Sequence, residues 1–472
     1  MNAFIKRLIH FSIGPVLGAV ISFITVPLTT YFISPEEYGK ASLFMLLQVL
    51  MAAYLYIGID QAYTREYREV ENKNLLLQNA LVLPMAMATI ISILFLFNMS
   101  HLSNLLWGDS EQYGPIVLLM ISMYGMVFER FLLLSIRMEE KAMTYSFFSV
   151  LIKLLVLLVT LGVLLFWRKD FLSVIYASII GQLLADGILL VVFRKKMRFR
   201  LEYFDKKLIK KLFLFGIPVF IAFSIEGIFT AMDRFSLNWL SNFKELGLYT
   251  VALKVASLMK VFQSSFTSFW VPTAYRWFDE KKPIHYYQKV SDLVVIVFSI
   301  LFIMIMLFKE TIPIIFTEDY KLIIYIIPYL LLVPVFYTIS ETTTLGIVFM
   351  RKTHLNIWVS ISAICVNILC IFLFVPAFGA KGAALSTGVA YFIYYCMRTY
   401  FSTKIWPGLK IKSQLVILFL LLINAGCNTF MEKNVWLINS LFLVFLIIVA
   451  FRYIYNYKSE KKINAKKMKL GI

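Results

Sequence analysis

Long runs of apolar residues recur along nearly the whole chain of 472 residues. A helix needs about 20 apolar residues to cross the roughly 30 Å hydrocarbon layer of a bilayer. Hydrophobic residues make up 60% of the chain and charged residues 15%, which is far more apolar than a soluble domain. Because lipid offers backbone amides no hydrogen-bond partner, these runs must be helical. We expect an all-α membrane protein with about fourteen transmembrane helices.

The apolar runs are separated by short polar loops, which set the expected spans. We place the spans near residues 8–33, 41–59, 75–97, 115–136, 146–166, 171–193, 212–233, 248–272, 290–308, 322–347, 355–375, 382–401, 414–430 and 436–455. Residues 194–211, with nine Lys and Arg, form the strongest break in the chain.

Short strings of the first part of the sequence recur after this basic loop. Ile5-Lys6-Arg7-Leu8 recurs as Ile209-Lys210-Lys211-Leu212, and Glu37-Tyr38-Gly39 recurs as Glu245-Leu246-Gly247. Weak similarity between halves is typical of transporters built from repeats, although short strings also match by chance. We predict an N-lobe at 1–193, a basic cytoplasmic linker at 194–211, a C-lobe at 212–401, and two further helices with a basic tail at 402–472. Each lobe has six helices, and the lobes are related by a pseudo-twofold axis.

The basic residues predict the orientation. Placing the amino terminus in the cytoplasm puts most of the 46 Lys and Arg in inside loops and tails, as the positive-inside rule requires. We therefore expect a multi-pass membrane protein with both termini in the cytoplasm. The net charge of +19 then reflects topology and anionic lipid head groups, and we expect no nucleic-acid partner.

Polar residues follow one face of several spans. A charge inside the bilayer costs at least about 2.5 kcal/mol, so charges that persist there usually face water or protein. Span eight has Lys254 and Lys260 on a face with hydroxyl groups, and Lys153 lies in span five. The wall that we expect around a hydrated cavity consists of Ser22, Thr25, Thr29, Ser257, Ser264, Thr267, Asn356 and Ser360. Lysines attract anions such as phosphate, and hydroxyl and amide groups can exchange hydrogen bonds with a polar ligand in place of water. The alternative is that the uncharged stripes only pack helices together.

Other charged residues in the spans are candidates for coupling or gating. These candidates are Glu226, Asp233, Arg234, Glu341 and Asp186. For Lys254 and Lys260, ion pairing with Glu226 or Asp233 is the structural alternative. We expect Lys153 to pair with Asp186 across neighbouring helices as structure. A local ion pair between Asp233 and Arg234 explains these two residues as well as gating does.

Three turn motifs resemble a transporter family. They are Ser34-Pro35-Glu36-Glu37-Tyr38-Gly39, then Asp233-Arg234 followed by Gly247-Leu248-Tyr249, and Pro376-x-Phe378-Gly379-Ala380-x-Gly382-Ala383-Ala384. In this order the chain resembles the polysaccharide transporters of the multidrug/oligosaccharidyl-lipid/polysaccharide (MOP) superfamily. The resemblance implies a Wzx-type flippase that moves undecaprenyl-pyrophosphate-linked O-antigen units to the periplasmic leaflet for lipopolysaccharide. It further implies a bacterial protein of the inner (cytoplasmic) membrane, with membrane lipids and polysaccharide polymerase or chain-length machinery as partners. We favour a monomer.

Other classes of function leave different patterns. No nucleotide-binding P-loop motif and no metal-ligand spacing occur in the sequence, and we expect no cofactor, no metal and no catalytic residue. A membrane polymerase or ligase would need larger outer loops than this chain has. A drug or cation antiporter of the MOP superfamily is the nearer alternative and would offer an acidic or aromatic pocket. A scaffold for envelope assembly would give the polar stripes no purpose.

Overall fold

The chain is helical throughout its described part. The computed structural model describes the backbone of residues 2–469 and the side chains of residues 13–225 and 227–453. No β-strand occurs between residues 2 and 469. Two compact units divide the chain, unit 1 at Met1–Gly247 and unit 2 at Leu248–Ile472. The predicted all-α membrane class is confirmed.

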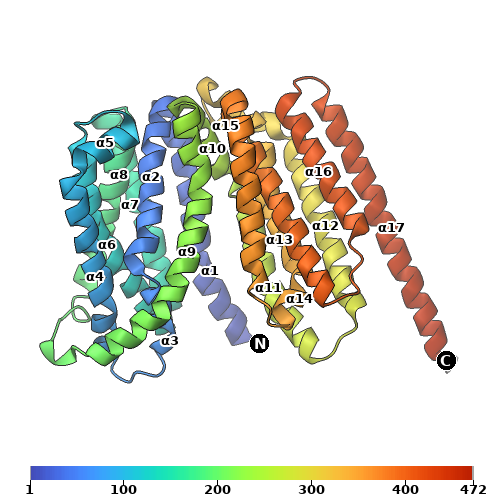
Figure 1. Cartoon of the computed structure of the whole chain (residues 1–472), viewed down its shortest axis with the longest axis horizontal. Coiled ribbons are helices and arrows are strands. Elements are labelled where there is room, and N and C mark those ends of the chain that lie inside the picture. The colour runs from blue at the N-terminus through green and yellow to red at the C-terminus, as the bar shows by residue number, and fades with distance from the viewer. Residues whose placement is uncertain (1, 470–472) are drawn as a thin grey trace. The chain divides into compact units, whose positions relative to one another are not determined.

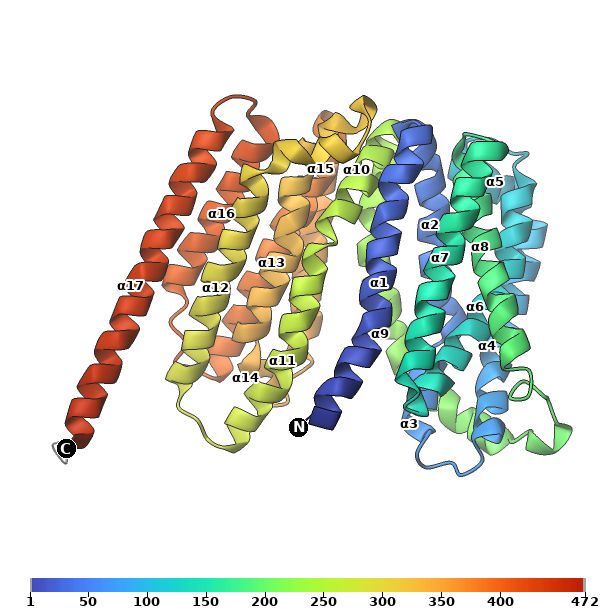
Figure 2. The same ribbon diagram turned by 180° about the vertical axis from the view of Figure 1, so that it is seen from behind.

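Unit 1 is a bundle of long helices joined by short loops (Figure 1). Its helices are α1 (Asn2–Phe32), α2 (Pro35–Tyr56), α3 (Ile59–Glu66), α4 (Lys73–Phe97), α5 (Met99–Trp107), α6 (Tyr113–Met138), α7 (Ala142–Phe166), α8 (Phe171–Val192), the 3₁₀ turn η1 (Leu201–Tyr203) and α9 (Lys206–Leu240). Helix α1 packs along α7, and α7 packs along α8, as Figure 2 shows. Helix α10 (Phe243–Ala256) begins in unit 1 and ends in unit 2.

Unit 2 is a second bundle. Its helices are α11 (Met259–Asp279), α12 (Ile284–Leu307), η2 (Lys309–Ile315), η3 (Glu318–Tyr325), α13 (Ile327–Thr343), α14 (Leu345–Phe349), α15 (Leu355–Ile405), α16 (Lys412–Phe430) and α17 (Val435–Lys469). Helices α12, α13 and α16 pack side by side in this unit (Figure 2).

The number of helices agrees with the predicted spans. Eleven described helices are long and apolar enough to cross a membrane, and a bent pair, η3 with α13, makes a twelfth. Helix α15 is 51 residues long and bends at Gly379, where φ is 52°, so it contains two predicted spans. Helices α10 and α11 together cover the predicted span 248–272. Counted in this way, the chain has about fourteen spans.

Capping residues explain where several helices begin. Ser34 accepts a hydrogen bond from the Glu37 amide, and Pro35 occupies the first helical position of α2. Asp170 and Asp205 cap α8 and α9 in the same way. Such caps satisfy backbone amides that have no partner within the helix.

The repeated Gly residues of the sequence meet in unit 1. A Cβ atom on Gly39 would lie 1.9 Å from the carbonyl oxygen of Phe243, and one on Gly247 would lie 1.8 Å from that of Pro35. Each glycine therefore faces the residue four positions before the other, which is the reciprocal contact expected across a twofold axis. The amino-terminal turns of α2 and α10 can approach this closely only because both positions lack a side chain.

The basic loop after α8 is tied to α4. The amide of Asn79 donates to the carbonyl oxygen of Tyr203 at 2.6 Å, and its oxygen accepts from the Asp205 amide at 2.9 Å. Gln78 makes a similar pair of bonds with the backbone of Arg200. Since unit 1 also contains α9, which we assigned to the second lobe, the division into lobes with 194–211 as a linker stays a prediction.

Three buried asparagines join the last helices of unit 2. Asn424 and Asn428 on α16 donate to the side-chain oxygen of Asn439 on α17, at 3.0 and 2.8 Å. Asn439 in turn donates to the Met306 carbonyl of α12 at 3.3 Å. These polar groups thus bond to one another inside the bundle, as buried amides must.

Candidate transport site

The predicted cationic stripe lies at a break in the helix. Helix α10 ends at Ala256 and α11 begins at Met259, so Lys254 and Lys260 stand on either side of the break. Both lysines are exposed on unit 2, as is Ser264. Lys260 lies at the middle of the predicted span, where a lysine cannot rest in hydrocarbon without a large cost. The surface that bears these two residues therefore faces water or protein.

The hydroxyl groups beside the lysines bond mainly to their own helices. Ser257 donates to the Lys254 carbonyl at 2.6 Å, and Ser264 donates to the Val261 carbonyl at 3.0 Å. A hydroxyl that donates to its own backbone still has lone pairs left to accept from a ligand. The buried Thr267 hydroxyl has no hydrogen-bond partner among the described residues.

The stripe on α1 combines hydroxyls with glycines. Thr25 and Thr29 donate to backbone carbonyls one turn earlier, at 2.8 and 2.7 Å, and Ser22 is half-buried. The Thr29 side chain is only 2% exposed, so at this end the stripe packs against protein. Near the other end, the Gly14 amide donates to Ser146 of α7 at 3.2 Å.

Lys153 does not pair with Asp186. This expectation was wrong, because no ion pair within 4 Å joins the two side chains in the described residues. Lys153 is exposed on α7, and its positive charge interacts electrostatically with Glu129 of α6 instead. The stem of Lys153 lies near α1, 3.4 Å from the place where a Cβ on Gly18 would be.

A pair of acidic side chains occupies the interior of unit 1. Gln182 of α8 donates to the carboxylates of Glu129 and Asp186, the latter at 3.1 Å. Asp186 is 3% exposed, and its Oδ2 atom has no hydrogen-bond partner among the described residues. A Cβ at Gly125 would lie 2.4 Å from this oxygen, so the glycine makes room for the carboxylate. Two carboxylates that share one donor in this way, Asp186 buried and Glu129 half-buried, can share a proton.

Next to this pair, Arg130 forms an ion pair that the sequence analysis missed. It donates to Asp60 of α3 through Nε at 3.1 Å and Nη2 at 2.5 Å, and it lies 5.6 Å from the centre of the Tyr56 ring. Charges in spans are rare, so the adjacent Glu129 and Arg130 in a predicted span were a sign that could have been used.

In unit 2, Glu341 is held by Arg398. The guanidinium donates to the Glu341 carboxylate at 2.6 Å and to the Ser340 hydroxyl at 2.9 Å, and it lies near the rings of Tyr337 and Tyr394. Glu341 and Arg398 are 9% and 8% exposed. The sequence analysis named Glu341 but missed Arg398 on α15. This pair neutralises both charges and ties α13 to α15.

The other candidate residues lie apart from these clusters. Asp233 is buried on α9. Its neighbour Arg234 is half-buried and lies close enough to Tyr38 of α2 for the two side chains to interact electrostatically. Asn356 and Ser360 are half-buried on α15. The side chain of Glu226 lies outside the described residues.

Comparison with known proteins identifies the family. A family model described as "Polysaccharide biosynthesis protein" matches residues 5–278, more than half of the chain. The chain belongs to this family. No curated protein sequence matches the chain significantly.

Solved structures show which fold this polysaccharide biosynthesis protein has. Lipid II flippase MurJ, in an inward closed conformation, is 18% identical with a TM-score of 0.73, covering 95% of this chain and 99% of MurJ. An inward-facing MATE family multidrug transporter is 17% identical with a TM-score of 0.64, covering 86% of this chain and 99% of the transporter. A MOP superfamily transporter from Pyrococcus furiosus is 16% identical with a TM-score of 0.55, covering 85% and 94%. The fold is that of MOP-superfamily transporters.

Proposed function

We propose that this protein is a flippase for lipid-linked oligosaccharides. It moves undecaprenyl-pyrophosphate-linked repeat units of O-antigen or a related polysaccharide from the cytoplasmic to the periplasmic leaflet of the inner membrane. Three observations support the proposal: the polysaccharide biosynthesis family, the fold shared with a lipid II flippase, and the exposed lysines inside a span. The lysines are the observation on which the proposal depends, because they bear on the sign of the substrate.

A pyrophosphate cannot cross hydrocarbon without compensation of its charge. Lys254 and Lys260 flank the break between α10 and α11 and offer two cations where the substrate would pass. The hydroxyl groups of Ser257 and Ser264 beside them are suited to sugar hydroxyls. Lys153 on the surface of unit 1 is a third candidate for the phosphate.

Coupling to an ion gradient is assigned to the buried carboxylates of unit 1. Asp186 has a carboxylate oxygen without a hydrogen-bond partner, and Glu129 shares its Gln182 donor. Asp233 and Arg234 remain candidates for gating. Glu341 is a weaker candidate for coupling than the sequence implied, because Arg398 already compensates its charge.

The orientation with both termini in the cytoplasm, and the absence of any catalysed reaction, belong to the same proposal. So does its place in lipopolysaccharide assembly, beside a polymerase and the chain-length machinery.

The test replaces both lysines in cells whose own copy of the gene is deleted. Lys254→Ala/Lys260→Ala should lower surface polysaccharide at least tenfold while the amount of protein in the membrane is unchanged. Lys254→Arg/Lys260→Arg keeps the charges and should retain surface polysaccharide. Lys281→Ala/Lys282→Ala removes two exposed lysines from the loop between α11 and α12 and should have no effect.

The second candidate is a MATE-like cation antiporter, which the buried carboxylates of unit 1 favour. Such a transporter would move cationic compounds, and removing the lysines would not harm it. Normal surface polysaccharide in the double alanine variant, together with active efflux of a cationic dye, would replace the flippase proposal with this one.

A further inference from the structure

One face of unit 1 has a pocket that none of the transport residues lines. Its volume is about 510 Å³, and it is lined by Pro15, Arg68, Arg137, Met138, Glu140 and Tyr145. Pockets that bind small molecules range from about 300 to 1,000 Å³. The lining comes from α1, the α3–α4 loop, the end of α6 and the start of α7, so four segments of one unit meet here.

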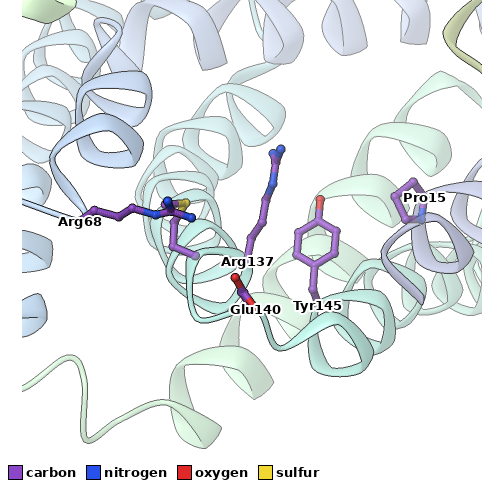
Figure 3. A pocket seen from close by; sticks show the side chains of 6 residues that line it. Pro15, Arg68, Arg137, Glu140 and Tyr145 are labelled. Atoms are coloured by element: carbon purple, nitrogen blue, oxygen red, sulfur yellow. The ribbon is translucent and has the colours of Figure 1, made fainter. Parts of the chain in front are cut away.

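Two arginines extend toward the same space. Figure 3 shows the side chains of Arg137 and Arg68 reaching into the pocket from different segments, with the Tyr145 hydroxyl pointing alongside Arg137. Both arginines are exposed. Neither guanidinium forms a hydrogen bond or an ion pair with another described side chain.

Four lysines near the pocket differ from the two arginines, because each of them has a hydrogen-bond or ion-pair partner. Lys196 and Lys141 both pair with Glu139, Lys211 pairs with Glu66, and Lys73 donates to backbone carbonyls. The acidic residues next to Arg68 and near Arg137 in sequence, Glu69 and Glu139, thus already pair with lysines. The two arginines that line the pocket have no ion pair with a described carboxylate, whereas these four lysines each have an acceptor.

One acidic residue does line the pocket. Glu140 follows α6 in the left-handed region, with φ of 58°. Among the described lining residues, this one negative charge stands against the two positive charges of Arg68 and Arg137. A guanidinium presents several N–H donors in a planar fork and binds phosphate oxygens in pairs. Two such groups, with a phenol as a further donor, match the oxygens of a diphosphate.

We propose that Arg68, Arg137 and Tyr145 form a phosphate-binding site that accepts a diphosphate head group. This site is separate from the lysines of α10 and α11. Its loops are on the face of unit 1 where residues 67–72, 139–141 and 193–205 gather, the end from which a cytoplasmic substrate would enter (Figure 1). Phosphate binding here stands on the geometry alone, whereas assigning it to the lipid-linked substrate rests on the proposed function.

The experiment measures binding of inorganic pyrophosphate to the purified full chain in nanodiscs of phosphatidylcholine. The wild type should bind pyrophosphate saturably and at least tenfold more tightly than inorganic phosphate. Arg68→Gln/Arg137→Gln should weaken pyrophosphate binding at least tenfold. The matched control is Arg194→Gln/Arg198→Gln, which removes two exposed charges that do not line the pocket, and it should change binding less than twofold.

A second arm identifies the source of the phosphate. Undecaprenyl pyrophosphate added to the nanodiscs should displace pyrophosphate, and phosphatidylglycerol at the same level should not. Displacement by phosphatidylglycerol alone would assign the site to bulk lipid head groups and overturn the diphosphate assignment. Equal binding by the wild type and the pocket variant, in a protein that elutes as a single folded species, would overturn the site itself.

These outcomes are independent of the test for transport. If the Lys254 and Lys260 variant exports polysaccharide normally, the flippase proposal fails, and pyrophosphate binding at the pocket can still be present. If the pocket variant binds pyrophosphate as the wild type does, the pocket proposal fails, and the flippase proposal is unaffected.

Discussion

The Glu341–Arg398 pair allows a test that separates a structural role from a role in coupling. Glu341→Gln leaves the guanidinium of Arg398 buried, 8% exposed, without its counter-ion. Two charges 4 Å apart interact with about 4 kcal/mol at an effective dielectric constant near 20. Breaking one side of a buried pair costs about 3–5 kcal/mol in measured cases. We therefore expect Glu341→Gln to destabilise unit 2 by about 3–5 kcal/mol.

The assay is thermal unfolding of the purified protein, followed by tryptophan fluorescence. Trp270 is a suitable reporter because its indole donates to the Glu341 carbonyl at 3.2 Å. A domain of 150–250 residues loses about 2–4 °C of Tm for each kcal/mol. The predicted loss of Tm is therefore roughly 6–20 °C.

The control removes both charges. Glu341→Leu/Arg398→Met replaces the pair by apolar side chains, which is often neutral or stabilising. The free energy of unfolding of this double variant should therefore lie within about 1 kcal/mol of the wild-type value. If this double variant is stable and still delivers surface polysaccharide, Glu341 serves the bundle and not coupling. A wild-type Tm in Glu341→Gln would refute the reasoning, because it would mean that the buried charge of Arg398 needs no partner.

Three further predictions concern unit 1 and the orientation. Gly39→Ala should destabilise the protein by about 1–3 kcal/mol, because the new Cβ would lie 1.9 Å from the Phe243 carbonyl oxygen. The control Gly162→Ala, whose new Cβ would have no atom within 4 Å, should not destabilise it. Thermal unfolding of the two variants measures the difference. Burial opposes the charge of Glu139, but hydrogen bonds and charges from Lys141 and Lys196 outweigh it and hold its pKa below the usual range. Its stabilisation is present above the unfolded pKa and is lost as pH falls through the lower folded pKa, so Glu139→Gln should flatten the loss of stability in acid. A reporter fused after residue 205 should report cytoplasm and one near residue 105 periplasm, and the reverse would overturn the orientation.

Hydrophobic length was enough to predict the fold class. Runs of about 20 apolar residues cannot be anything but helices in lipid, so their number followed from counting. The repeat of Glu37-Tyr38-Gly39 at Glu245-Leu246-Gly247 was visible in the sequence. Its meaning was not, because only the structure shows that Gly39 and Gly247 each face the backbone of the other segment. A repeat shows that two segments are alike and says nothing of whether they touch.

The partners of charges were the part that sequence could not give. Helical phase placed Asp186 on a polar face. It could not show that Gln182, one turn earlier on the same helix, would join Asp186 to Glu129, which lies more than 50 residues earlier in the sequence. Helices α6 and α8 are neighbours in the bundle for reasons of overall packing. Arg398 was missed because it lies near the end of a predicted span, where arginine usually reaches the head groups. The structure instead buries it against Glu341.

The charged residues inside the spans therefore fall into two classes, those buried in an ion pair and those exposed on a unit. Substitutions in the two classes should have different phenotypes. Glu341 and Arg398 are buried against each other, so their loss acts first on stability, and removing both restores it. Lys254 and Lys260 are instead exposed on unit 2, so truncation to alanine removes side chains that are not part of the buried core. Changing them should leave the Tm nearly unchanged and act on transport. A transport defect in the lysine variant that vanished when the Tm was restored by a second, stabilising substitution would show that these lysines also serve the fold.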